Sequence, residues 1–287
     1  MKRSKYEFNA ESREEFYRYP ERHYVTPFRI CGNLYFVGNT SVGAHLIDTG
    51  DGLILIDTTY PTTKALLVQS IWELGFRPQD IRMILHTHGH FDHFGATALL
   101  KELSGAKTYL GEGDARMFQE RPELALTSFC KYAIPDVFEP DEIMRDGDII
   151  TLGNTSIRIV STPGHSDGVI SFFVTVEENG VPLIAGMHGG AGMNTMCRPF
   201  IEQYHNEHCR DAFVTGIARV YEEPVDITLG NHTGQNNTLE KQQYRLEHPE
   251  AANPFIDSGE WKSYLDRVMD RFWTMLREEA EGTDVIL

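Results

Sequence analysis

The sequence predicts an α/β (α+β) protein in which two β-sheets pack against each other and helices lie outside them. Two observations carry this prediction: strand patterns fall in two blocks, and helical patterns follow each block. A third is composition, since a hydrophobic share of 41% over 287 residues is ordinary for a globular protein with a sizeable buried core. Because a sheet must bury one apolar face, the two blocks are expected to pack together.

The first block of strands lies within residues 33–59. Asp51-Gly52 supplies a hairpin turn between the runs AHLID and LILID. A helix is expected over 62–75, where apolar residues recur at helical intervals. The run IRMILHT then predicts a strand, and a second amphipathic helix is expected over 94–106. The histidine-rich stretch between that strand and that helix therefore lies on a loop.

The second block begins with a hairpin over 146–165 that turns at Gly153-Asn154. VISFFVTV and VPLIAG follow as further strands, a helix is expected between 202 and 221, and VDITLGNH contains one more short strand. The C-terminal helices are expected within 236–280, where apolar residues form a stripe along WKSYLDRVMDRFWTMLREEA.

Residues 25–287 are expected to form a single domain behind a polar N-terminal arm, 1–24, since the chain has no short repeat and no low-complexity linker. The formal net charge of -16 argues against nucleic acid as a partner, because binding a phosphate backbone depends on basic surfaces. A small-molecule substrate is the expected partner. The sequence leaves the oligomeric state open.

No segment has the length of a membrane span, and no apolar stretch follows the basic start MKRSK as in a signal peptide. A cytoplasmic location without membrane association is therefore expected. The cysteines are scattered without a CxxC pair, which is typical of reduced thiols rather than of a disulfide framework. They are Cys31, Cys130, Cys197 and Cys209.

The stretch LHTHGHFDHFG holds four histidines and one aspartate within eleven residues. Residues two apart on an extended segment point to the same side, so either His86 with His88 or His88 with His90 can converge on one metal ion. Asp92 and His93 lie where the next helix begins, and a turn there would place them beside a neighbouring ion. Zinc suits imidazole and carboxylate ligands. The alternative is a histidine-rich turn without a shared role.

The pattern HxHxDH, from His88 to His93, resembles the signature of the metallo-β-lactamase superfamily. STPGH with His165 and ITLGNH with His232 resemble its later histidine motifs, and the resemblance extends from about Phe28 to the C-terminus. It implies an αββα sandwich of two mixed sheets packed face to face, with metal ligands on loops at one edge. It also implies one metal held by His88, His90 and His165, and a second held by Asp92, His93 and His232.

The resemblance further implies a zinc-dependent hydrolase with a binuclear site. Hydroxide bound to two zinc ions would attack the carbonyl of a small lactam, lactone, amide or ester, with Asp92 orienting it or handling a proton. Many members carry a bridging aspartate where this chain has LIAGMHGG, so the pattern is most similar to subclass B3. Iron at the same ligands, in an oxidoreductase, and a non-catalytic metal-binding descendant are the alternatives.

Other polar residues lie outside the implied ligand set. His86 is expected to support or pack against the ligands rather than to be one, and Asp57 either orients ligands or caps a turn. His188 follows the missing carboxylate and would lean into the site or bind substrate. The HNEHC run, 205–209, is expected on one helix face, as a solvated surface with a buried thiol rather than an extra metal site. Residues 189–200 are expected to form an irregular segment beside the substrate mouth.

Overall fold

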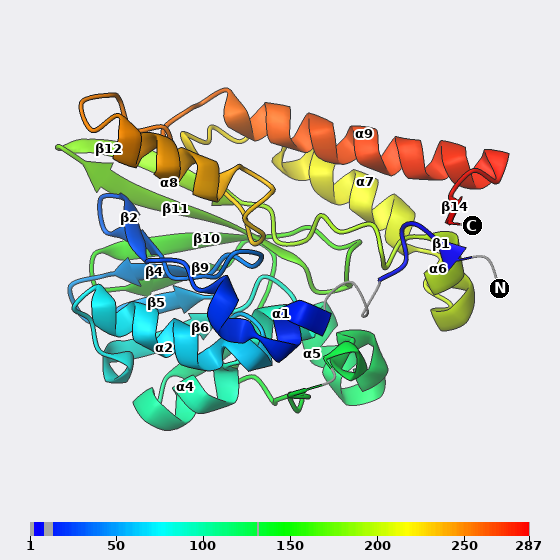
Figure 1. The fold of residues 1–287 in the computed structure, drawn as a ribbon, viewed down its shortest axis with the longest axis horizontal. Helices are drawn as coiled ribbons and strands as arrows, with labels where there is room; N and C mark the ends of the chain where they lie inside the picture. The colour runs from blue at the N-terminus through cyan, green and yellow to red at the C-terminus, as the bar shows by residue number, and fades with distance from the viewer. Residues whose placement is uncertain (1–2, 9–13, 131, 287) are drawn as a thin grey trace.

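The computed structural model describes residues 3–8, 14–130 and 132–286, and in this part of the chain the first block of strands forms one mixed sheet (Figure 1). Its order is β2-β3-β4-β5-β6-β7-β8, antiparallel up to β5 and parallel from β5 to β8. The strands are β2 (Phe28–Cys31), β3 (Leu34–Phe36), β4 (His45–Asp48), β5 (Leu53–Ile56), β6 (Ile81–Leu85), β7 (Lys107–Gly111) and β8 (Glu142–Met144).

The second block forms a sheet ordered β13-β12-β11-β10-β9. Neighbouring strands are antiparallel except for β12 and β13, which are parallel, so this sheet is mixed as well. The strands are β9 (Ile149–Leu152), β10 (Thr155–Ser161), β11 (Ile170–Glu178), β12 (Val181–Met187) and β13 (Ile227–Leu229).

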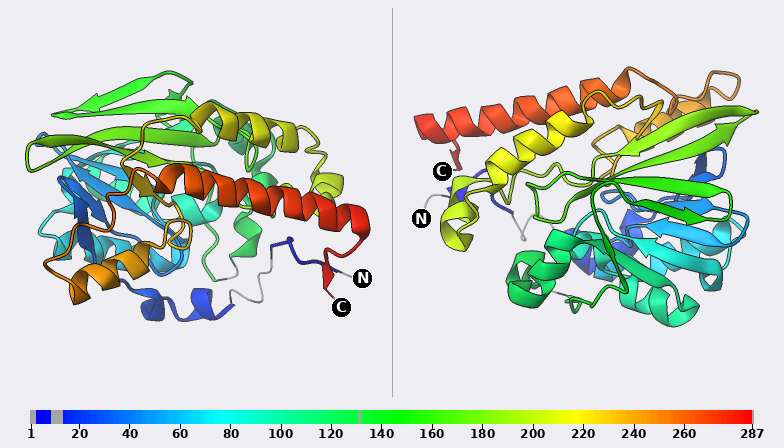
Figure 2. Two further views of the ribbon diagram at one scale, coloured as in Figure 1. Left: turned by 90° about the horizontal axis from the view of Figure 1, so that it is seen from above. Right: turned by 180° about the vertical axis from the view of Figure 1, so that it is seen from behind.

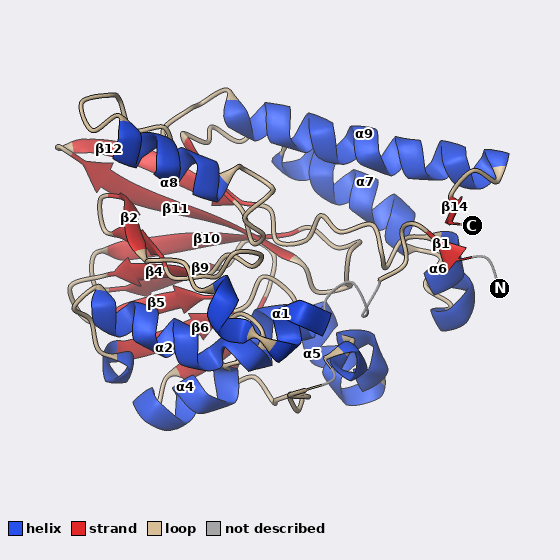
Figure 3. Ribbon diagram, in the orientation of Figure 1, coloured by secondary structure: helices blue, strands red, loops and turns tan. Residues whose placement is uncertain are grey.

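The strand β5 shows how the layers are built, because all four of its side chains are buried. Ile54 and Ile56 face the second sheet and join a core with residues such as Phe172. Leu53 and Leu55, which alternate with them, pack under the outer helices instead. The predicted sandwich of two mixed sheets with helices outside is thereby confirmed (Figure 3).

Helices α2 (Lys64–Glu73) and α4 (Thr97–Ser104) cover the outer face of the first sheet, through residues such as Ile71 and Leu100. Gly105 ends α4 in the left-handed conformation, with φ 69°, which costs a glycine little. Further helices lie along the chain between strands of the first sheet. These are α3 (Phe91–Phe94), α5 (Glu112–Glu120), η3 (Pro61–Thr63), η4 (Pro78–Asp80), η5 (Pro122–Ala125) and η6 (Thr127–Phe129).

Helices α7 (Cys209–Val220) and α9 (Glu260–Glu281) cover the second sheet, and buried Phe213 and Phe272 pack between them. Figure 2 shows α9 alongside α7. The helix expected between 202 and 221 is present as α7, whereas α6 (Arg198–Tyr204) is a separate helix that ends at His205, whose φ of 53° cannot continue it. The run 205–209 therefore does not lie on one helix face. α8 (Thr238–Glu247) precedes α9.

The N-terminal segment packs against both ends of the domain. β1 (Arg3–Ser4) pairs with β14 (Val285–Ile286), which brings the two termini together (Figure 2). α1 (Glu14–Arg18) buries two aromatic side chains, and η2 (Pro20–His23) follows it. Phe8 stacks on Phe129 with 4.6 Å between ring centroids. None of the helices in the described residues has the length and apolar character needed to cross a membrane.

Candidate metal centre

The three histidine motifs lie on loops that follow the strands β6, β10 and β13. Residues 86–90 come directly after β6 and lead into α3, which carries Asp92 and His93. His165 lies on the loop between β10 and β11, and His232 lies just beyond β13. The loops meet at one edge of the sandwich, so ligands far apart in the sequence become neighbours.

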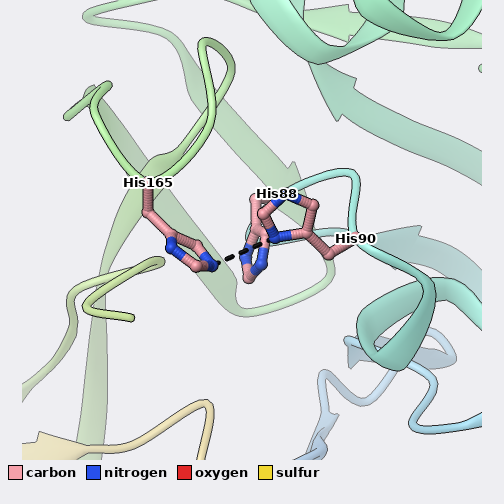
Figure 4. A group of neighbouring side chains, drawn as sticks. All are labelled: His88, His90 and His165. Carbon is pink, nitrogen blue, oxygen red and sulfur yellow. Dashed lines mark hydrogen bonds between the residues drawn. The ribbon is translucent and has the colours of Figure 1, made fainter. Parts of the chain in front are cut away.

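The first cluster consists of His88, His90 and His165, whose rings point toward one another (Figure 4), and all three are buried. Each offers a ring nitrogen, and the three nitrogens lie within 4.8 Å of one another. Nδ1 of His90 is 3.0 Å from Nε2 of His165. Two nitrogens bound to tetrahedral zinc at about 2.0–2.1 Å are about 3.3 Å apart. The spacing therefore fits one zinc ion.

The second cluster adjoins the first because His88 belongs to both. Ligand atoms of His88, Asp92 and His93 lie within 4.8 Å of one another. Oδ2 of Asp92 is 3.6 Å from Nε2 of His93 and 3.6 Å from Nε2 of His232. Asp92, His93 and His232 thus gather beside the first cluster, and the His232 side chain is the most exposed of the three, at 33%.

Four of the histidines are oriented by hydrogen bonds from Nδ1 to fixed oxygen atoms. Such bonds leave Nε2 as a lone-pair donor and hold the ring in place. Nε2 of His88 and of His93 is buried and has no hydrogen-bond partner among the described residues, as expected of groups that await a metal. The bonds run from His88 to Gly189 O at 2.8 Å, His93 to Asp57 Oδ2 at 2.7 Å, His165 to Gly192 O at 2.9 Å and His232 to Ser41 O at 3.2 Å.

The protonation states of His88, His90 and Asp92 favour metal binding. Burial and the neighbouring histidines hold the pKa values of His88 and His90 well below the usual range, so these rings are neutral. Burial acts to raise the pKa of Asp92, but His93 and His232 outweigh it and lower that pKa to about 2. Neutral imidazoles and an ionised carboxylate are the forms that bind a metal.

Asp57 follows β5 and lies under the ligand loop. Its carboxylate is fully buried and accepts hydrogen bonds from Thr87 N at 2.8 Å, Thr87 Oγ1 at 2.8 Å and His93 Nδ1 at 2.7 Å. Its φ of 60° is uncommon for a residue other than glycine. The three bonds join the end of β5 to Thr87, just before the HxHxDH motif, and to His93, its last residue.

His86 and His188 are buried outside the two clusters. His86 uses both ring nitrogens in protein hydrogen bonds, to Tyr109 O at 2.8 Å and Thr97 Oγ1 at 2.7 Å, so neither nitrogen is available to a metal. His188 lies beside Phe213, with 6.2 Å between ring centroids, and burial lowers its pKa to about 3. It joins neither group of ligand atoms in the described residues.

Asp114, on α5, connects two ligand loops and was not anticipated from the sequence. It accepts hydrogen bonds from Gly89 N at 2.6 Å, Ser166 Oγ at 2.7 Å and Gly168 N at 2.8 Å. Burial raises its pKa to about 6. Aspartates are common in the first turn of a helix because their charge interacts favourably with the helix dipole. The sequence around Asp114 therefore gives no signal that it joins the two loops.

The clusters open into a cleft of about 640 Å³. His90, Asp92 and His232 line it on one side, and α9 contributes Arg267 and Arg271. The segment after β12 is irregular up to α6, as expected for residues 189–200, and its Ala191, Gly192 and Asn194 also line the cleft. A concave site of this size suits a small molecule.

Comparison with known proteins agrees with this geometry. The family model of the metallo-β-lactamase superfamily matches residues 37–178. The subclass B3 enzyme BJP-1 of Bradyrhizobium japonicum superposes with a TM-score of 0.80 at 28% identity, over 91% of this chain and 97% of that one. The chain belongs to the metallo-β-lactamase superfamily.

Further superfamily relatives are similar over different extents. FEZ-1 of Legionella gormanii has a TM-score of 0.81 at 26% identity, over 90% of this chain and 98% of that one. Hydroxyacylglutathione hydrolase GloC of Haemophilus influenzae is 34% identical over 110 residues, or 37% of this chain and 49% of that protein. The chain thus spans about half the length of this curated relative, while the structural likeness covers nearly all of each neighbour.

Proposed function

We propose that the protein is a zinc-dependent hydrolase in which water attacks the carbonyl carbon of a small lactam, lactone, amide or ester and the bond from that carbon to nitrogen or oxygen is cleaved. The observation that carries this proposal is the pair of adjacent clusters, in which four of the five histidines are oriented through Nδ1. Two structural neighbours are subclass B3 or related metallo-β-lactamases, and one curated relative is a hydroxyacylglutathione hydrolase, which supports hydrolysis at a carbonyl.

Two zinc ions per chain fit the donors. His88, His90 and His165 would hold the first, and Asp92, His93 and His232 the second. The fit rests on the buried Nε2 atoms of His88 and His93, which lack partners among the described residues, and on the 3.0 Å separation between His90 and His165. When bound, zinc activates water and polarises a carbonyl oxygen.

The chain's own residues position the reactants. Asp92 lies at the base of the cleft with a pKa of about 2, so its carboxylate is ionised at neutral pH and can orient the attacking water or accept its proton at Oδ2. Phe8 and Phe91 line the same cleft and exclude bulk water from one side. His86 keeps its ring outside the clusters and is proposed to pack rather than to bind metal.

A screen of zinc-loaded protein against lactams, lactones, thioesters and amides tests this function. The native chain is expected to hydrolyse at least one class, and His90→Ala is expected to lose at least 100-fold in kcat/KM, as loss of a ligand disrupts the site. His205→Ala is the matched control, since its side chain is 82% exposed and outside the clusters. Equal activity of the native chain and His90→Ala would refute the proposal.

A further inference from the structure

Helix α9 presents two arginines to the cleft opposite the metal centre. The side of α9 that lines the cleft carries residues at spacings of three and four, as one face of a helix must. These residues are Tyr264, Arg267, Val268 and Arg271. Tyr264 and Val268 are buried in the core below, whereas both guanidinium groups are exposed to the cleft.

Neither arginine forms a salt bridge among the described residues. Among the described residues, no Asp or Glu oxygen lies within 4.0 Å of Arg267 or Arg271. Other basic side chains on or beside α9 do have such partners: Lys262 pairs with Glu222, and Arg210 pairs with Glu279 at 2.6 Å. In a chain with a net charge of -16, two arginines that face one cleft without a salt-bridge partner among the described residues are a specific feature rather than an average surface.

Arg267 is positioned next to the proposed second metal site. Its Nη2 donates to Gln235 O at 3.4 Å, and the Gln235 side chain accepts from His232 N at 3.4 Å. Arg271 lies one turn further along α9, about 6 Å away by the rise of a helix. The two arginines thus extend from the His232 loop along the wall of the cleft.

We propose that Arg267 and Arg271 bind a carboxylate group of the substrate, so that the enzyme prefers anionic substrates to uncharged ones. This inference rests on the proposed hydrolase function of the same cleft. A guanidinium presents N–H donors in a planar fork that matches a carboxylate, and two of them on one helix face fix where the anion lies. A substrate held there would direct its carbonyl towards Asp92 and the histidine clusters.

The test compares a chromogenic cephalosporin as the free acid and as its methyl ester. Zinc-loaded native protein, Arg267→Gln/Arg271→Gln and the control Arg277→Gln are assayed with both. Arg277 is an exposed arginine of α9 that does not line the cleft. For the acid, the kcat/KM of the double variant is expected to fall about 10- to 50-fold, mainly because KM rises. This size is typical of hydrogen bonds to a charged group that solvent partly screens. For the ester, the change is expected to stay within about twofold, and Arg277→Gln is expected to behave as the native chain.

Equal losses for acid and ester, or no loss for the acid, would overturn the carboxylate site while leaving the hydrolase proposal intact. If the native chain hydrolyses neither compound, calorimetric titration with mercaptocarboxylates HS–(CH2)n–COO⁻ and their methyl esters replaces turnover. The native chain is then expected to bind at least one acid about tenfold more tightly than its ester. That preference must vanish in the double variant; if it persists there or is absent from the native chain, the inference is wrong.

Discussion

Asp57 Oδ2 lies 2.7 Å from Nδ1 of His93, and both groups are fully buried. The carboxylate thereby determines which nitrogen of His93 carries the proton and which one faces the cluster. Thr87 donates two more hydrogen bonds to the same carboxylate, so one side chain at the end of β5 holds the loop that presents the proposed ligands. Metal affinity is therefore expected to depend on a residue that touches no metal.

Asp57→Asn is expected to weaken zinc binding about 10- to 100-fold, because an amide cannot accept from His93, Thr87 N and Thr87 Oγ1 together. Chelator competition measures this affinity. Asp51→Asn is the control, since Asp51 is exposed in the β4-β5 turn. The metal-free variants are also unfolded with urea, which separates lost zinc affinity from lost stability. Unchanged zinc affinity in Asp57→Asn would contradict the positioning role.

His86 and His90 are expected to respond differently to substitution. His86→Phe removes hydrogen bonds to Tyr109 and Thr97, so the free energy of unfolding should fall by about 1–3 kcal/mol while zinc content stays near the native value. His90→Ala should lose zinc. Elemental analysis and urea unfolding of both variants measure the two effects. Zinc loss in His86→Phe with zinc kept in His90→Ala would reverse the ligand assignment.

Asp92→Asn is expected to lower kcat by about 100-fold or more, because it removes both a proposed ligand and the proposed proton acceptor. Steady-state assays at saturating zinc separate the two contributions, since added zinc can restore occupancy but not the carboxylate. Full activity in this variant would contradict the role assigned to Asp92.

His45 is expected to make the metal-free protein sensitive to acid. Burial lowers its pKa from 6.5 to about 4, so between these values the unfolded chain binds a proton that the folded chain does not. Stability is thus complete above pH 6.5 and falls as the pH decreases towards 4. Between pH 7 and 5, His45→Leu should lose about 2 kcal/mol less of its free energy of unfolding than the native chain does. Equal pH dependence in urea titrations would show that His45 is not responsible.

The two packed sheets follow from patterns that are local in the sequence, whereas the meeting of the three histidine motifs is implied by the resemblance to the superfamily. Alternation and turn signals predict β4, β5 and β10, and a strand-to-helix loop predicts where His88 and His90 lie. Local patterns do not reveal the break at His205, because its left-handed backbone occurs at a residue that gives no turn signal. Without the resemblance, local patterns also do not decide whether His86 or His90 is the metal ligand beside His88. His86 is excluded by its hydrogen bonds to residues of β7 and α4, which are distant in the sequence.

Side chains whose role depends on distant loops were harder to predict. Asp114 bonds to Gly89 and Gly168, which lie 25 and 54 residues away, so nothing near it in the sequence marks the contact. Arg267 and Arg271 belong to a helix with an ordinary amphipathic pattern, and only the packing of α9 over the second sheet brings them to the cleft. Tertiary contact, rather than local propensity, assigns these roles.

The most direct test of the central claim is elemental analysis of protein purified without added metal, together with the same measurement on His90→Ala. The proposal predicts close to two zinc ions per native chain and a clear loss of zinc in the variant. One or two iron ions with little zinc would contradict the zinc hydrolase and favour the oxidoreductase alternative. Absence of stoichiometric metal after zinc is also supplied would contradict a metal centre altogether.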